Sequence, residues 1–187
     1  SFGAGGADAY VLKLDSAGNL EWQKTFGGSG HDYAYSIQQT TDDGYIVAGY
    51  TNSFGAGDDD AYVLKLDSAG TLQWQKVFGG SSDDFAYSIQ QTSDGGYIVA
   101  GYTWSFGAGS RDVYVLKLDS AGNLEWQKTF GRSNYHGDVA YSIQQTTDDG
   151  YIVAGDTYSY GAGSRDAYIL KLDSAGTLQW QKVFGGS

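Results

Sequence analysis

One segment occurs four times along this chain of 187 residues, and its copies begin at Ser1, Ser53, Ser105 and Ser159. The first three starts lie 52 residues apart and the last interval is 54 residues, so the period is nearly constant. The fourth copy ends part-way, which leaves three full periods and about half of another. A repeat of this length predicts similar supersecondary units, each of which buries its apolar face against its neighbour.

Each period contains four short runs with the composition of β-strands, which in the first copy span residues 9–15, 20–26, 34–40 and 45–51. The runs are rich in Val, Ile, Leu, Tyr, Trp and Thr, and Gly, Asp, Ser and Asn bound them. Apolar residues alternate along the runs, and no window has the 3.6-residue period of a helix. The short connections SAGN and TDDG suit tight hairpin turns. The sequence therefore predicts an all-β fold of four-stranded antiparallel units.

The segments AYSIQQTSDGGYIVAGYT and DAYVLKLDSAGTLQWQKVFGG resemble β-propeller repeats of the WD40 and quinoprotein type. The hairpins LDSAGNLEW and LDSAGTLQW are similar to the quinoprotein hairpin in particular. The resemblance implies a β-propeller with four-stranded antiparallel blades of about 52 residues. It extends to tandem repeats of secreted bacterial and archaeal surface proteins, which implies an extracellular or cell-surface location. It also implies that the outer strand of each blade carries a structural tryptophan, which is Trp22, Trp74, Trp126 or Trp180.

Under this layout residues 1–187 form one propeller segment, in which a half blade precedes three blades. The half blade spans residues 1–28, and the blades span residues 29–80, 81–132 and 133–187. Propellers close with about 4–8 blades, so a single chain would leave strand edges open. We therefore expect at least two chains to associate into a homo-oligomer. Alternate copies share SAGNLEWQKTF or SAGTLQWQKVF, which favours a ring of six or eight blades.

The copies differ mainly in their two long loops, which propeller connectivity would place on one face of the molecule. Aromatic rings can stack on sugars while polar groups bind hydroxyls, so this loop composition suits carbohydrate. Several weak sites would then act together through avidity. The alternative is relaxed sequence drift in exposed loops. The predicted ligand-binding residues are Asn52, Trp104, Arg111, Tyr135, Tyr158, Tyr160 and Arg165.

Acidic residues outnumber basic ones, and the formal net charge is −11 at pH 7. This charge repels phosphate backbones and anionic lipid, which makes nucleic acid and membranes poor partners. No apolar run approaches the ~20 residues of a membrane span. Calcium is the metal that the run Asp58, Asp59 and Asp60 would suit, although it matches no EF-hand loop. The recurrent Asp32, Asp84 and Asp138 are expected to be structural, because they precede the same strand in successive copies.

The near-identity of the copies leaves no unique group of acid, base and metal ligands, which argues against catalysis. The chain also has no cysteine, and therefore neither a disulfide framework nor a thiolate metal site. We expect a non-catalytic binding or scaffold module without an organic cofactor. The first alternative is a purely structural surface repeat protein that self-assembles. The second alternative, which follows from the quinoprotein resemblance, is an enzyme fragment.

Overall fold

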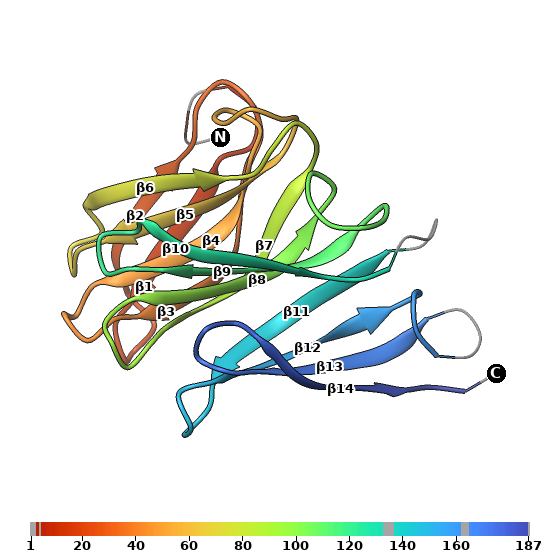
Figure 1. Ribbon diagram of the computed structural model, residues 1–187. Helices are drawn as coiled ribbons and strands as arrows, with labels where there is room; N and C mark the ends of the chain where they lie inside the picture. Colours follow the sequence, from red (N-terminus) through yellow and green to blue (C-terminus); the bar gives the residue numbers. More distant parts are fainter. Residues whose placement is uncertain (1–2, 4, 133–136, 162–164, 187) are drawn as a thin grey trace.

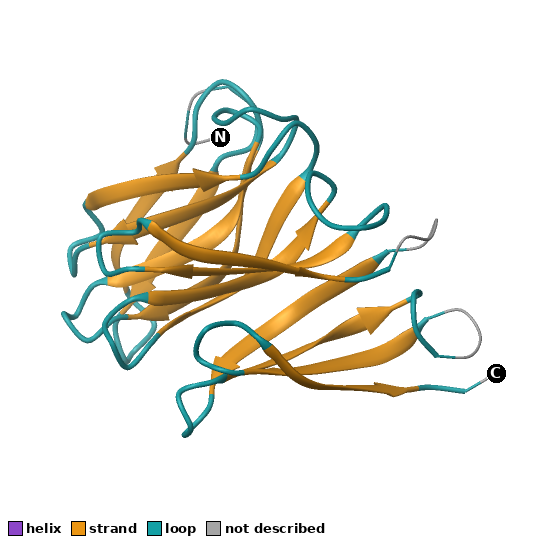
Figure 2. Cartoon of the chain, viewed as in Figure 1, coloured by secondary structure: helices purple, strands orange, loops and turns teal. Residues whose placement is uncertain are grey.

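The computed structural model describes residues 3, 5–132, 137–161 and 165–186. All regular elements in this part of the chain are β-strands, which form one two-stranded sheet and three four-stranded sheets (Figure 2). The prediction of an all-β fold is confirmed, and no helix that could span a membrane occurs among the described residues. The two-stranded sheet contains β1 (Ala9–Leu14) and β2 (Leu20–Phe26). The four-stranded sheets contain β3 (Asp32–Gln39), β4 (Tyr45–Thr51), β5 (Asp60–Leu66) and β6 (Leu72–Phe78); β7 (Asp84–Gln91), β8 (Tyr97–Thr103), β9 (Asp112–Leu118) and β10 (Leu124–Phe130); and β11 (Asp138–Gln145), β12 (Tyr151–Thr157), β13 (Asp166–Leu172) and β14 (Leu178–Phe184).

Strands that are consecutive in the chain pair antiparallel within each sheet. The hairpin between the last two strands turns at a glycine with positive φ, which is +84° at Gly18 and +75° at Gly70. The hairpin between the first two strands needs the same conformation, which Gly95 adopts in the second complete copy of the turn. Asp43 and Asp149 adopt it in the flanking copies, with φ of 62° and 59°. Asp is among the few residues with a side chain that visit this region readily.

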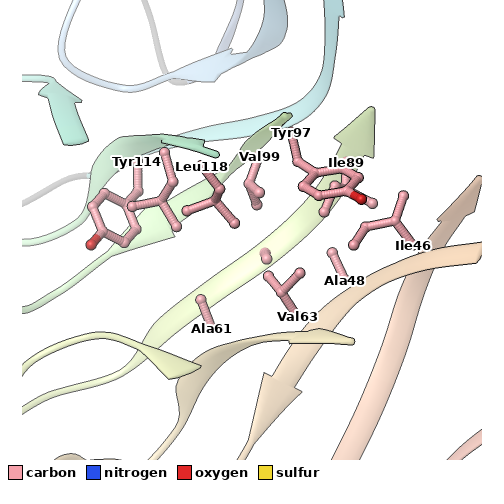
Figure 3. Packing of buried hydrophobic residues seen from close by; sticks show 11 residues of the cluster. Ile46, Ala48, Ala61, Val63, Ile89, Tyr97, Val99, Tyr114 and Leu118 are labelled. Atoms are coloured by element: carbon pink, nitrogen blue, oxygen red, sulfur yellow. The ribbon is translucent and has the colours of Figure 1, made fainter. Parts of the chain in front are cut away.

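The four sheets lie in a row in chain order (Figure 1). The sheet β1–β2 is at one end, next to β3–β6, and the sheet β11–β14 is at the other end, next to β7–β10. Apolar side chains fill the space between neighbouring sheets (Figure 3). Ile46 and Val63 of one sheet, for example, pack with Tyr97 and Leu116 of the next sheet, and all four are at most 2% exposed.

The first strands of the four-stranded sheets are β3, β7 and β11, and β7 contacts both of the others. Side chains of one strand bind the backbone of the next: Gln38 Oε1 accepts a hydrogen bond from Gln91 N at 2.6 Å, and Gln90 Oε1 accepts one from Gln145 N at 2.7 Å. In the QQ pair of β7, the side chain of the first glutamine accepts a hydrogen bond from the next sheet. The backbone N–H of the second glutamine donates one to the preceding sheet. These bridges fix the spacing of the sheets along their first strands.

Candidate binding surface at the long-loop end

The long loops of successive repeats lie together at one end of the sheets, where backbone hydrogen bonds join them. Asp84 N donates to Asp59 O at 2.6 Å, which connects the loop before β5 with the start of β7. Trp104 N donates to Asp83 O at 2.8 Å, which connects the loop after β8 with the loop before β7. One repeat earlier, the bond from Asn52 N to His31 O is equivalent to the bond from Trp104 N to Asp83 O. The sheets thus hold the variable loops against one another as a continuous surface.

Buried carboxylates at the start of the first strands hold these loops through hydrogen bonds. Asp32 and Asp84, each fully buried, begin the first strands of their sheets. Asp84 accepts hydrogen bonds from Gly80 N at 2.8 Å and from Ser105 Oγ at 2.6 Å. Asp32 does the same with Gly28 N and Ser53 Oγ, at 2.9 and 2.6 Å. In the last sheet the equally buried Asp138 accepts from Thr157 Oγ1.

A second carboxylate, which is buried, lies close to Asp84 and to Asp138, namely Asp60 and Asp112. Asp60 begins β5 and accepts hydrogen bonds from Ala56 N at 2.8 Å and Gly57 N at 3.2 Å. A Cβ atom at Gly79 would lie 1.8 Å from Asp60 Oδ1 and 2.7 Å from Asp84 Oδ2, so the two carboxylates converge on this glycine. Burial raises the pKa of Asp60, and the nearby charge of Asp84 acts in the same direction. Within the described chain, Asp60 Oδ1 is buried and has no hydrogen-bond partner.

The calcium candidates Asp58, Asp59 and Asp60 lie in different environments. Asp60 is buried in the pair just described, whereas Asp58 borders a surface pocket. Burial raises the pKa of Asp59, and the charge of Asp83 raises it further. Among residues 3, 5–132, 137–161 and 165–186, no group of three or more His, Cys, Asp or Glu side chains is placed to hold a metal ion.

Trp104 is the most prominent side chain of the long-loop end. It is 48% exposed and borders a pocket of about 280 Å³. The other residues of the pocket wall are Asp58, Ser81, Ser82 and Asp83. An exposed indole thus stands beside carboxylate and hydroxyl groups, all contributed by the loops at the junction of the second and third sheets.

The other predicted ligand-binding residues are distributed around this end of the molecule. Asn52, which occupies the position of Trp104 one repeat earlier, donates from its side chain to Asp58 O. Arg111 lies over the ring of Tyr102, with its Cζ 5.0 Å from the ring centroid. Tyr135 lies outside the described residues.

Arg165 joins three of its neighbours in the last sheet. Its guanidinium pairs with Asp156, which raises the pKa of Arg165. Its Cζ lies 6.0 Å from the ring centroid of Tyr158, another predicted ligand-binding residue. The same guanidinium donates a hydrogen bond to the hydroxyl of Tyr141.

Tyr160 is half-buried and contributes to packing instead of standing free in the loop. Its ring stacks on Tyr168 with centroids 5.3 Å apart, and Arg132 covers it at 4.3 Å. Phe54 and Phe106 hold the same position in earlier repeats and contact Tyr62 and Tyr114, with their rings tilted by 40° and 36°. The recurrence of an aromatic residue at this position was the sequence signal for a packing role.

The sequence interpretation missed a row of aromatic rings across the first strands. Tyr35, Tyr87 and Tyr141 each occupy the position that the strand pairing skips, and neighbouring rings lie 5.1 and 5.7 Å apart. Tyr35 and Tyr141 are 52% and 46% exposed. The sequence signal for this row was the motif AYS, which recurs in the first strand of each four-stranded sheet. The motif places a tyrosine between two small residues.

The family described as a domain of unknown function (DUF5122), beta-propeller, matches residues 92–125 and 147–178. These stretches contain the same repeat motif in two consecutive copies, and the two sheets that contain them have the same strand order. The repeats of this chain are β-propeller repeats. The predicted resemblance is thereby confirmed at the level of the repeat family.

One curated relative of the propeller repeats is the regulatory protein FlaEY of Caulobacter vibrioides, which is 29% identical over 140 residues. The match covers 64% of this chain but only 15% of FlaEY. A protein of unknown function from Bacteroides caccae has 12% identity and a TM-score of 0.43, over 91% of this chain and 73% of its own. A eukaryotic initiation factor structure has 9% identity and a TM-score of 0.46, over 95% of this chain and 43% of its own.

Proposed function

We propose that this propeller segment is a non-catalytic binding or scaffold module that binds carbohydrate at its long-loop end, outside the cell or at its surface. The observation that supports the proposal is the exposed indole of Trp104 beside the pocket formed with Asp58, Ser81, Ser82 and Asp83. Tryptophan is enriched at the surfaces through which proteins bind their partners.

The chemistry of the pocket suits a sugar ring. The flat face of the Trp104 indole can cover the apolar C–H face of a pyranose, and the carboxylates of Asp58 and Asp83 can accept hydrogen bonds from its hydroxyl groups. The negative charge of these carboxylates disfavours acidic sugars, so the ligand class is a neutral glycan. The pocket of about 280 Å³ is near the lower end of the ~300–1,000 Å³ typical of small-molecule sites, which suits a short glycan segment.

The scaffold of this module consists, in our proposal, of a half blade followed by three blades, and association of chains completes the ring. The half blade is the sheet β1–β2, because its strands carry the third-strand and fourth-strand motifs of the repeat. Its β1 has no strand on its other side in the described chain, whereas the equivalent β5 pairs with β4.

A glycan array probed with the labelled chain, followed by calorimetric titration of the best neutral glycan, tests the carbohydrate proposal. Trp104→Ala should weaken binding at least about tenfold, which corresponds to ~1.4 kcal/mol. Leu124→Ala, a change at an exposed apolar residue beside the short turns at the opposite end of the sheets, is the control and should leave binding within about twofold. Hits that survive Trp104→Ala, or the absence of any reproducible hit, would contradict the carbohydrate proposal.

A purely structural surface protein that self-assembles is the second candidate. It is favoured by the apolar side chains exposed at both ends of the row of sheets, among them Leu12 at 46% and Phe184 at 61%. The glycan array distinguishes the two candidates, because a structural protein would assemble without binding any sugar.

A further inference from the structure

We propose that two copies of this chain associate head to tail, with β14 of one copy packed on the turn between β1 and β2 of the next copy. The contact would reproduce the one that already joins successive sheets within the chain. This inference rests on the association of chains in the proposed function and is independent of carbohydrate binding.

The template for this interface is a tryptophan that lies on a glycine of the following sheet. A Cβ atom at Gly70 would come within 2.9 Å of the Trp22 indole, and one at Gly122 would come equally close to Trp74. Gly176 has the same relationship with Trp126, at 2.8 Å. The indole of Trp22 also donates to Ser68 O in this turn, at 3.2 Å. Three junctions in the chain therefore use one and the same contact.

The two ends of the chain carry the separate halves of a fourth such contact. Trp180 of β14 is 44% exposed, because no sheet follows it in the described chain. Gly18 is exposed, and a Cβ atom there would have no neighbour within 4 Å, whereas Gly70, Gly122 and Gly176 are buried. One end therefore offers the indole and the other end offers the glycine turn.

Apolar side chains beside Gly18 at one end and beside Trp180 at the other end are also exposed. Tyr10, Leu12 and Leu14 of β1 are 45–49% exposed, whereas their equivalents Tyr62, Leu64 and Leu66 of β5 are at most 2% exposed. At the other end Phe184 is 61% exposed, while its equivalents in β6 and β10 are packed against the core. Burial of these side chains would supply the apolar area of the interface.

The residue types at the two ends also match those of an existing junction. Strand β14 reads LQWQKVF, as β6 does, and the turn after β1 reads SAGN, as the turn after β9 does. At the existing junction Lys76 Nζ donates to Asn123 Oδ1 at 3.3 Å. The equivalent pair between two copies is Lys182 with Asn19. A second copy is therefore the occupant that satisfies both the apolar and the polar groups of this surface.

A contact between two different surfaces extends into a closed ring or an open chain of copies. The net charge of −11 on each copy opposes the approach of two chains and is screened by salt. Association should therefore strengthen as the salt concentration rises.

Sedimentation velocity of the full chain over a range of concentrations measures this association. Trp180→Ala and Gly18→Asn should each raise the dissociation constant at least about tenfold. The first change removes the indole, and the second places a side chain where the indole would lie. Asn is chosen because it accepts the positive φ of Gly18. The controls are Trp104→Ala, an equally exposed tryptophan elsewhere, and Gly95→Asn, which has φ +82° and equally open surroundings. Both controls should associate like the parent chain.

Cross-linking identifies which surfaces meet. The chain has no cysteine, so Asn19→Cys in one preparation and Lys182→Cys in another provide two unique thiols. A short bis-maleimide should join them into a heterodimer in the mixture, more efficiently than it joins either variant with itself. The double variant Lys76→Cys with Asn123→Cys should cross-link within one chain and calibrates the reagent. Monomers at all concentrations, or dimers without the Asn19–Lys182 cross-link, would overturn the proposal even if glycans bind.

Discussion

The indole of Trp74 lies so close to Gly122 in the following sheet that a Cβ atom there would come within 2.9 Å of the ring. Trp74 is half-buried against the core, whereas Trp180 at the same position of the last sheet is 44% exposed. We expect Trp74→Ala to lower the free energy of unfolding by about 2–4 kcal/mol, slightly less than for a fully buried tryptophan. Trp180→Ala should change it by less than about 0.5 kcal/mol in dilute solution. Urea unfolding followed by circular dichroism gives both values, and equal losses would contradict this difference.

The convergence of Asp60 and Asp84 on Gly79 leaves no room for a methyl group. Gly79→Ala would place its Cβ 1.8 Å from Asp60 Oδ1, whereas the Cβ of Gly186→Ala would have no neighbour within 4 Å. We expect the first change to cost about 2–4 kcal/mol and to disturb both carboxylates, and the second to be neutral. Thermal unfolding of the two variants compares them, and a Gly79→Ala protein with unchanged midpoint would show that the loop shifts freely.

The glutamine bridges between first strands offer a second matched pair. Gln90 Oε1 accepts a hydrogen bond from Gln145 N, and its loss leaves that backbone group unpaired. We expect Gln90→Leu to cost about 1–3 kcal/mol and to speed hydrogen exchange at the Gln145 amide. Gln144 occupies the same position in β11, where no sheet follows in the described chain, so Gln144→Leu should have little effect. A Gln145 amide that exchanges equally slowly in the parent and Gln90→Leu proteins would argue against this role of the bridge.

Carboxylates in the short turns predict acid sensitivity below pH 4. A hydrogen bond from Thr40 and the ammonium of Lys65 lower the pKa of Asp42 to about 2. Burial acts against the charged form of Asp94, but hydrogen bonds from Lys117 and Thr92 outweigh it and lower that pKa to about 2 as well. The stability that these charged carboxylates contribute is therefore complete above the ordinary value of 3.8 and is lost as the pH falls toward 2.

The buried pairs act in the opposite direction. Burial raises the pKa of Asp60 and Asp112, so proton uptake by these groups favours the folded state as the pH falls toward 3.8. Unfolding free energies measured from pH 6 to pH 2 should therefore hold or rise slightly at first and then decrease steeply. Asp42→Asn, together with Asp94→Asn, should flatten the decrease, and a decrease of unchanged steepness in that variant would show that other groups control acid unfolding.

Much of the fold follows from period-two alternation in a repeated sequence, but the limits of the strands do not. The sequence places the first strand at residues 34–40, whereas β3 begins at Asp32, because Asp32 and Tyr33 pair with Thr51 and Tyr50 of the next strand. The irregularity at Tyr35 was not foreseen either. It depends on the register between two strands, which residue-by-residue alternation does not contain.

The sequence predicted where the candidate surface lies better than it predicted which residues form it. Loop variation pointed to the end where Trp104, Arg111 and Arg165 lie, because substitutions accumulate where packing tolerates them. Sequence variation also marked Tyr160, although its ring packs on Tyr168, and Phe54 at the same position contacts Tyr62. The convergence of Asp60 with Asp84 was not predicted, because it joins residues of two sheets that only the packing of one sheet on the next brings together.

Each strand in the described sheets pairs only with strands next to it in the sequence. No strand of one described sheet pairs with a strand of another, so tension applied to the ends of the polypeptide can detach one sheet at a time once its loop bonds and side-chain contacts with the next sheet break. A protein built this way would extend under force in nearly equal steps, each corresponding to the unfolding of one sheet. It would shorten again when the force is removed, because each sheet can refold from its own continuous segment of chain.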